Sequence, residues 1–216
     1  MMNLKLPRRK FLHLAAGAAA LPGVMAASSV LAQPVTGTRV KGPRVWLDMD
    51  QKELDDAYDQ RVYAPNIQQV IARCERIGEL VRERLGAPKR LAYGPTPIEA
   101  LDLYTTKAAN APVNIFVHGG AWRAGLAKGN AHHAEMLVNA GAHLAVVDFN
   151  NVIETGGNLM IMADQIRRGV VWVYKNARSF GGDPERIYVT GHSSGGHWVG
   201  VLLTTDWQKD FGMPPT

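Results

Sequence analysis

Residues 182–198, GDPERIYVTGHSSGGHW, contain the pattern that decides the fold. Ile187 to Thr190 is rich in β-branched and aromatic residues and predicts a strand, and a helix is predicted from about Ser194 to Thr204. Between them, Gly191-His192-Ser193-Ser194-Gly195 fits the pattern G-x-S-x-G. Glycines on both sides permit a sharp reversal from strand to helix, which presents a serine hydroxyl at the edge of a sheet. The alternative is a plain tight turn, because Gly and Ser are also common turn residues.

A second glycine-rich motif follows another predicted strand. Val113 to Val117 is apolar enough for a buried strand, and it leads directly into His118-Gly119-Gly120-Ala121-Trp122. This is the third predicted strand of the domain, after which a serine hydrolase places part of its oxyanion hole. On this interpretation the backbone N–H groups of Gly120, Ala121 and Ser194 bind the anionic oxygen of a tetrahedral intermediate. A simple turn is again the alternative.

The order of elements predicts the fold class. Strands alternate with helices, which is typical of an α/β fold with a mostly parallel sheet and helices on both faces. Ligands bind beyond the carboxyl ends of the strands in such a sheet, and both glycine-rich motifs fall at that edge. The predicted strands are 89–93, 98–104, 113–117, 143–148 and 187–190, and the longer helices are 66–85, 130–140, 159–178 and 194–204.

Two helix starts are indicated by capping signals near the N-terminal end of the domain. Asp50 with Glu53 predicts a capping box that opens a short acidic helix to about Tyr63. Asn66 with Gln69 repeats the signal before the helix at 66–85, which carries an apolar stripe. The stripe consists of Ile67, Val70, Ile71, Cys74, Ile77, Val81 and Leu85. The single cysteine, Cys74, is therefore expected to be buried and unreactive.

Residues 1–32 have the composition of an export signal. Four positive charges in the first ten residues precede an Ala- and Gly-rich apolar stretch, and the pair Arg8-Arg9 resembles a twin-arginine signal. We expect cleavage after Ala32, a linker over 33–47, a domain over 48–216, and a periplasmic or secreted protein without stable membrane association. The alternative is a membrane anchor, although glycine and proline make this stretch a weak spanning helix.

Charge and residue spacing exclude several classes of function. Removal of the four cations of the signal leaves 20 basic against 19 acidic residues, so the formal charge falls from +5 to +1. No basic stripe with interleaved aromatic residues remains, and we expect no nucleic-acid partner. His132, His133 and His143 lack a metal-ligand spacing, and surface or loop-supporting roles are expected for them, with the first two on different faces of a helix. No dinucleotide or phosphate-binding fingerprint is present, and no feature indicates an oligomeric state.

The motifs HGGAW and GGDPERIYVTGHSSGGH, with their separation, resemble those of the α/β-hydrolase superfamily. The resemblance covers about residues 48–212 and is to the esterase group with an HGG-type oxyanion loop, including its arylformamidase (kynurenine formamidase-like) members. It implies Ser193 as the nucleophile of a cofactor-free, metal-free serine hydrolase that acts on a small-molecule ester or amide. It further implies that Trp122 and His118 line the substrate pocket, and that His118 stabilises the loop rather than reacting.

The base and acid of a catalytic triad are not evident in the sequence. In this fold they follow the nucleophile along the chain, where only His197, Asp206 and Asp210 are found. His197 lies one helical turn after Ser193, so a role as base is weighed against helix packing or pocket lining. We expect a fold that is incomplete at its C-terminus; the functional alternative is a non-catalytic binding protein or an inactive truncated product. Asp148 and Asp164 are possible hydrogen-bond anchors for the oxyanion loop.

Overall fold

The structure is a computed structural model that describes residues 39–214. The predicted signal at 1–32 and the start of the predicted linker lie outside the described residues. The chain divides into two compact units, one ending at Asp55 and the other beginning at Asp56. None of the helices between residues 39 and 214 has the length and apolar character that a bilayer crossing needs.

The N-terminal unit contains a short antiparallel pair of strands, β1 (Arg44–Trp46) and β2 (Met49–Asp50), followed by the start of α2 (Gln51–Tyr58). The predicted capping box is formed, because the N–H of Glu53 donates to Asp50 and the N–H of Asp50 donates to Glu53, each at 2.9 Å. The prediction of a single helix that reaches Tyr63 is wrong. Asp59 adopts an extended conformation that ends α2 and caps a separate turn, α3 (Gln60–Tyr63).

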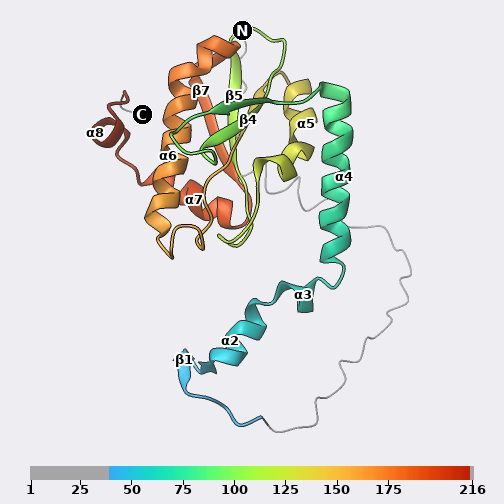
Figure 1. Cartoon of the computed structure of the whole chain (residues 1–216), viewed down its shortest axis with the longest axis vertical. Helices are drawn as coiled ribbons and strands as arrows, with labels where there is room; N and C mark the ends of the chain where they lie inside the picture. The colour runs from blue at the N-terminus through green and yellow to red at the C-terminus, as the bar shows by residue number, and fades with distance from the viewer. Residues whose placement is uncertain (1–38, 215–216) are drawn as a thin grey trace, which may run out of the picture. The chain divides into compact units, whose positions relative to one another are not determined.

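The second unit is built on a five-stranded mixed sheet, which confirms the predicted α/β-hydrolase fold (Figure 1). The order is β3-β4-β6-β5-β7, with β4 antiparallel to both neighbours and β5 parallel to β6 and β7. Four of the five strands therefore run in one direction. Their bounds are β3 (Lys89–Ala92), β4 (Ala100–Tyr104), β5 (Ala111–Val117), β6 (His143–Val147) and β7 (Gly182–Gly191).

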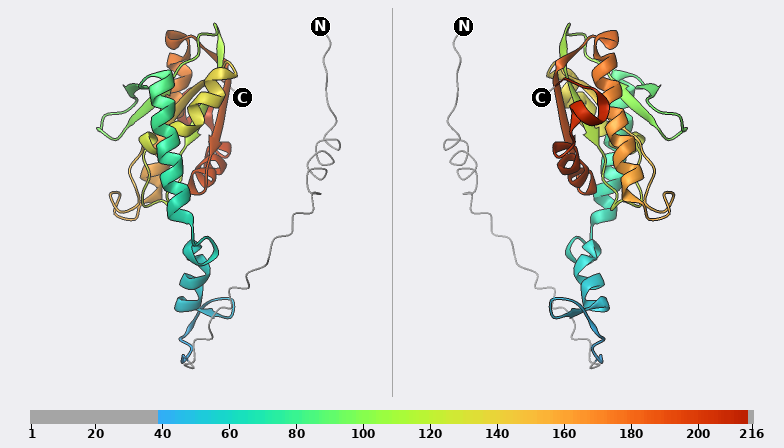
Figure 2. Two further views of the ribbon diagram at one scale, coloured as in Figure 1. Left: turned by 90° about the vertical axis from the view of Figure 1, so that its right-hand side faces the viewer. Right: turned by 90° about the vertical axis from the view of Figure 1, so that its left-hand side faces the viewer.

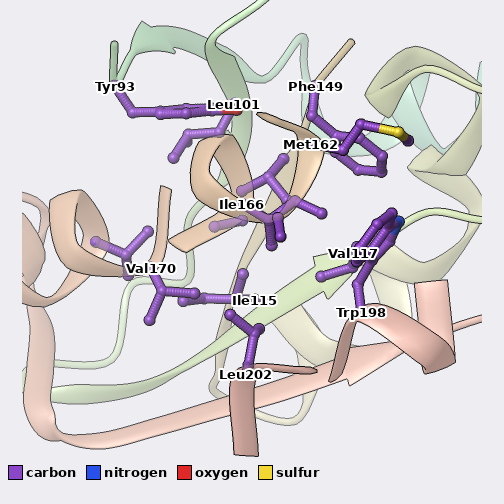
Figure 3. Packing of buried hydrophobic residues seen from close by; sticks show 14 of the residues in the cluster. Tyr93, Leu101, Ile115, Val117, Phe149, Met162, Ile166, Val170, Trp198 and Leu202 are labelled. Carbon is purple, nitrogen blue, oxygen red and sulfur yellow. The ribbon is translucent and has the colours of Figure 1, made fainter. Parts of the chain in front are cut away.

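Helices cover both faces of this sheet, and the two views of Figure 2 look onto these opposite faces. One face carries α6 (Leu159–Asn176) and α7 (Ser194–Leu203), and the other carries α4 (Ile67–Leu85), a 3-10 helix, η1 (Ala127–His133), and α5 (Ala134–Asn139). Alternate residues of one strand point to opposite faces. Ile115 accordingly packs with Ile166 and Trp198 under α6 and α7 (Figure 3), whereas Phe116 packs in the cluster beside α4. A 3-10 turn, η2 (Ala177–Phe180), and a short helix, α8 (Trp207–Phe211), complete the unit.

The helix α4 is less buried than its sequence predicts. Only Gly78 and Val81 are buried, and Val70 and Ile71 remain 49% and 45% exposed. Cys74 is half-buried rather than buried, because only the C-terminal half of the helix packs on η1. Asn66 is at the predicted N-cap position, but its side chain makes no capping hydrogen bond.

Candidate active site

Ser193 lies at a strained reversal between β7 and α7. Its backbone dihedral angles, φ 53° and ψ −123°, define a conformation that L-residues rarely adopt. Such a conformation usually raises the free energy of the folded state by about 1–3 kcal/mol. The flanking glycines are required by close approaches of the backbone: a Cβ on Gly191 would lie 2.4 Å from the Gly195 carbonyl oxygen, and a Cβ on Gly195 would lie 2.0 Å from that of Val117. The turn leaves the Ser193 side chain exposed. The residue is therefore presented to solvent by the fold rather than packed into it.

The loop after β5 is held in an unusual backbone conformation. Gly120, Ala121 and Trp122 have φ values of 130°, 52° and 61°, so three consecutive residues lie in the positive-φ region. The carbonyl of Gly120 accepts from the N–H groups of Arg123 and Ala124, which closes the turn. In the described part of the chain, no acceptor is found for the N–H groups of Gly120, Ala121 or Ser194. These three donors remain available to an anionic ligand, and the N-terminus of α7 adds a partial positive charge.

This loop lies directly against the serine turn. A Cβ on Gly119 would be only 3.1 Å from the Cβ of Ser193 and 2.8 Å from the carbonyl oxygen of His192. The N–H of Trp122 donates to Ser194 Oγ at 3.3 Å, and the N–H of His192 donates to the Val117 carbonyl at 3.2 Å. The two glycine-rich motifs, which begin 73 positions apart in the chain, thus form one continuous surface beside the Ser193 hydroxyl.

His118 is buried beneath the loop rather than directed at a reacting group. Its side chain is 2% exposed and stacks on Phe149 with a centroid separation of 4.5 Å. Its Nδ1–H donates to the Gly119 carbonyl at 2.9 Å. Burial lowers the pKa of His118, which keeps the ring neutral at neutral pH despite the nearby Asp148. This arrangement suits a residue that supports the loop.

A small cavity of about 40 Å³ adjoins the loop. His118 and Trp122, both predicted to line a pocket, are among its lining residues, as is Ser194. Sequence reasoning missed the others, which come from the hairpin β3–β4, from the loop after β5 itself, from the loop after β6 and from α6. They include the apolar Ile98, Leu126, Phe149 and Met162 and the polar Asn150, Asn151 and Glu154. Figure 3 shows Phe149 and Met162 lying side by side at one end of the core.

Comparison with known proteins identifies the group to which this arrangement belongs. The BD-FAE family model matches residues 101–212, a range that holds both glycine-rich motifs. The chain belongs to the BD-FAE family. Together with the relatives described next, this match confirms the predicted resemblance to α/β-hydrolases of the esterase and arylformamidase group.

Two curated relatives of this BD-FAE family member carry names from that group. The kynurenine formamidase of Salmo salar is 29% identical over 176 residues, which are 76% of this chain and 56% of the relative. The isoprenylcysteine alpha-carbonyl methylesterase ICME of Arabidopsis thaliana is 33% identical over 124 residues, which are 56% of this chain and 29% of the relative. The chain thus spans about half, or less, of the length of these relatives.

One solved structure supports the same fold. A crystal structure described as a candidate thioesterase from Silicibacter sp. TM1040 superposes with a TM-score of 0.59 at 24% identity. The match covers 74% of this chain and 70% of the other. It supports the fold of this BD-FAE family member and not its activity.

His197 is engaged with Trp122 in this BD-FAE family chain. The indole N–H of Trp122 donates to His197 Nδ1 at 3.3 Å, and the two rings meet edge to face with centroids 5.6 Å apart. Between residues 39 and 214, no hydrogen bond joins a histidine to the Ser193 hydroxyl. His197 Nδ1 is therefore engaged by the pocket residue Trp122 and not by Ser193.

His132, His133 and the two candidate anchor aspartates lie in different surroundings. The prediction that His132 and His133 point to different faces is wrong, because their rings lie against each other with centroids 4.0 Å apart. Both are half-buried, and burial lowers the pKa of His133 to about 4. In the described residues, no group of three His, Cys, Asp or Glu is arranged to hold a metal. Asp164 pairs with Arg167 on the exposed side of α6, whereas Asp148 contacts the loop after β5.

Proposed function

We propose that this protein is a serine hydrolase that cleaves a carboxylic ester or an aryl formamide through an acyl-enzyme on Ser193. The observation that carries the proposal is the contact between the strained turn at Ser193 and the loop at Gly119. A turn that served only to connect β7 to α7 would not need to hold a serine at positive φ against a second strained loop. Two such conformations meeting at one point are typical of a catalytic site.

The geometry accounts for the chemistry of the first step. The Ser193 oxygen forms a bond to the substrate carbonyl carbon, and the carbonyl oxygen becomes an anion as its π electrons move onto it. The N–H groups of Gly120, Ala121 and Ser194 are free to donate to that oxygen. Loss of one such donor typically raises the barrier by about 3 kcal/mol. The bond between the carbonyl carbon and the leaving group then breaks, and the alcohol or arylamine departs with the proton that Ser193 gave up. Water releases the acyl group as an acid in a second step and restores the Ser193 hydroxyl.

Neither His118 nor His197 is proposed as the general base. His118 is buried with its Nδ1–H on the Gly119 carbonyl, and His197 accepts from Trp122. The resemblance predicts that a histidine and a carboxylate complete a catalytic triad with Ser193, and this stays a prediction. The competing proposal is a fold of this type that binds a ligand or partner without catalysis.

The proposed substrates are small and largely apolar. The relatives are named for a methyl ester and for a formamide, and both reactions transfer an acyl group. The small cavity beside the loop is lined largely by aromatic and aliphatic side chains, which favours a short acyl or small aromatic group. From the signal-like residues 1–32 we also propose that the protein acts in the periplasm or is secreted.

A fluorophosphonate probe tests the proposal, because it phosphonylates only an activated serine. The intact protein should be labelled, and Ser193→Ala should abolish labelling while leaving the circular dichroism spectrum unchanged. Ser179→Ala is the matched control, since Ser179 is exposed on η2 at the opposite end of the sheet and should label like wild type. A folded intact protein that reacts no faster than Ser193→Ala would overturn the proposal and favour a binding protein.

A further inference from the structure

The loop from His118 to Ala127 needs a restraint, because its conformation is strained. Three consecutive positive φ values, two of them at Ala121 and Trp122, persist only when the surroundings hold them in place. The loop also folds back tightly, since a Cβ on Gly125 would lie 2.3 Å from the Gly119 carbonyl oxygen and 2.6 Å from His118 Nδ1. What fixes the two ends of the loop therefore decides where its N–H groups point.

One buried carboxylate contacts both ends. Asp148, which follows β6 and is 3% exposed, accepts a hydrogen bond from the N–H of Ala127 on its Oδ1 atom. The same Oδ1 atom lies 3.7 Å from His118 Nε2, so the imidazole packs against the carboxylate. The next residue, Phe149, stacks on the ring face of His118. Asp148 thus holds the end of the loop by a hydrogen bond, and Asp148 and Phe149 hold its start by packing against His118.

Asp148 is itself held from a different part of the sheet. Arg90 of β3 pairs with Asp148 Oδ2 at 2.6 Å and with Asp102 of β4 at 3.0 Å. Tyr93 donates its hydroxyl proton to the Asp148 carbonyl, and the N–H of Asp148 donates to the Ala100 carbonyl at 3.0 Å. The hairpin β3–β4 therefore anchors Asp148 through its second carboxylate oxygen and through its backbone.

We propose that Asp148, held by Arg90, is a positioning residue that keeps the donors of Gly120 and Ala121 aimed at the reacting carbonyl oxygen. Asp148 does not touch the substrate, and it acts through His118 and Ala127. This inference rests on the proposed function and adds a residue outside the two glycine-rich motifs. Displacement of a catalytic group by about 1 Å typically lowers the rate about 100-fold, so a loosened loop is expected to lower turnover strongly.

The test compares Asp148→Asn with wild type in the intact protein, with p-nitrophenyl acetate as the probe. The amide keeps an oxygen for Ala127 but loses the ion pair with Arg90. We expect kcat to fall about 10- to 100-fold with KM within about twofold, because the donors act mainly on the transition state. Asp183→Asn is the matched control: Asp183 also pairs with an arginine, Arg186, at 2.7 Å, but at the start of β7, far along the strand from Ser193. It should keep wild-type kcat.

A second variant keeps the inference testable if Asp148→Asn folds poorly. Arg90 is 44% exposed, so Arg90→Gln should fold and should lower kcat in the same direction by about threefold or more. A kcat within twofold of wild type in both variants, or a loss that merely follows the unfolded fraction, would overturn the inference. Failure of the proposed function is separate from this, because it would appear as undiminished hydrolysis in Ser193→Ala.

Discussion

Substitution Gly119→Ala should separate the loop from the serine turn by a small and calculable amount. The new Cβ would lie 2.8 Å from the His192 carbonyl oxygen, whereas ordinary contacts of this kind begin at 3.4 Å. The backbone on one side must therefore move by about 0.6 Å to restore van der Waals contact. A 1 Å displacement typically reduces the rate about 100-fold, so we expect about a tenfold loss, equal to about 1.4 kcal/mol of transition-state stabilisation.

The assay is the second-order rate constant for fluorophosphonate labelling, measured beside the thermal unfolding temperature. Gly200→Ala on α7, the helix that follows the serine turn, is the control, because a Cβ at Gly200 meets nothing within 4 Å. That variant should label like wild type and should be slightly more stable, since Ala is favoured over Gly inside a helix. Wild-type labelling by Gly119→Ala, or an equal loss in Gly200→Ala, would refute the reasoning.

Two further predictions concern the pocket and the stability of the fold. His197→Phe removes the acceptor of the Trp122 indole and should raise KM for p-nitrophenyl acetate about threefold with little change in kcat, measured by initial rates. Burial raises the pKa of Glu99, but hydrogen bonds from Thr96 and Arg168 outweigh it, and the net pKa lies below the ordinary 4.5. The ionised Glu99 carboxylate therefore stabilises the folded state above pH 4.5, and this stabilisation is lost as the pH falls through the lowered pKa. Glu99→Gln should lower the free energy of unfolding by about 2 kcal/mol at pH 7 and by less at pH 3, measured by urea unfolding. A stability difference that grew on acidification would contradict this assignment.

Local patterns predicted the elements that position the site. The strands ending at Val117 and near Thr190 were predicted because each is a short run of mostly apolar, β-branched or aromatic residues that leads into a glycine-rich motif. The reversal at Ser193 followed from the glycines on both sides, which the structure shows to be required by contacts under 3 Å. These features depend on residues that are close together in the chain, and they can therefore be predicted from one sequence.

Features that depend on packing between distant elements were not predictable in the same way. Asp148 was only one of two candidate anchors, since its partner Arg90 lies 58 positions earlier and reaches it through a hairpin register. The burial of α4 was overestimated because its apolar stripe is longer than the surface that η1 offers. Asp59 ended the first helix through its own backbone conformation, which competes with helix formation for this residue type.

Trapping the acyl-enzyme tests the central claim most directly. The intact protein is mixed with p-nitrophenyl acetate, quenched in acid within the first turnovers and digested with trypsin, and the peptide spanning 187–209 is sequenced by mass spectrometry. The account predicts one acetyl group on Ser193 and none on the adjacent Ser194, with the adduct absent from Ser193→Ala. Hydrolysis that proceeds without an acetylated Ser193, or with the acetyl group on another residue, would contradict it.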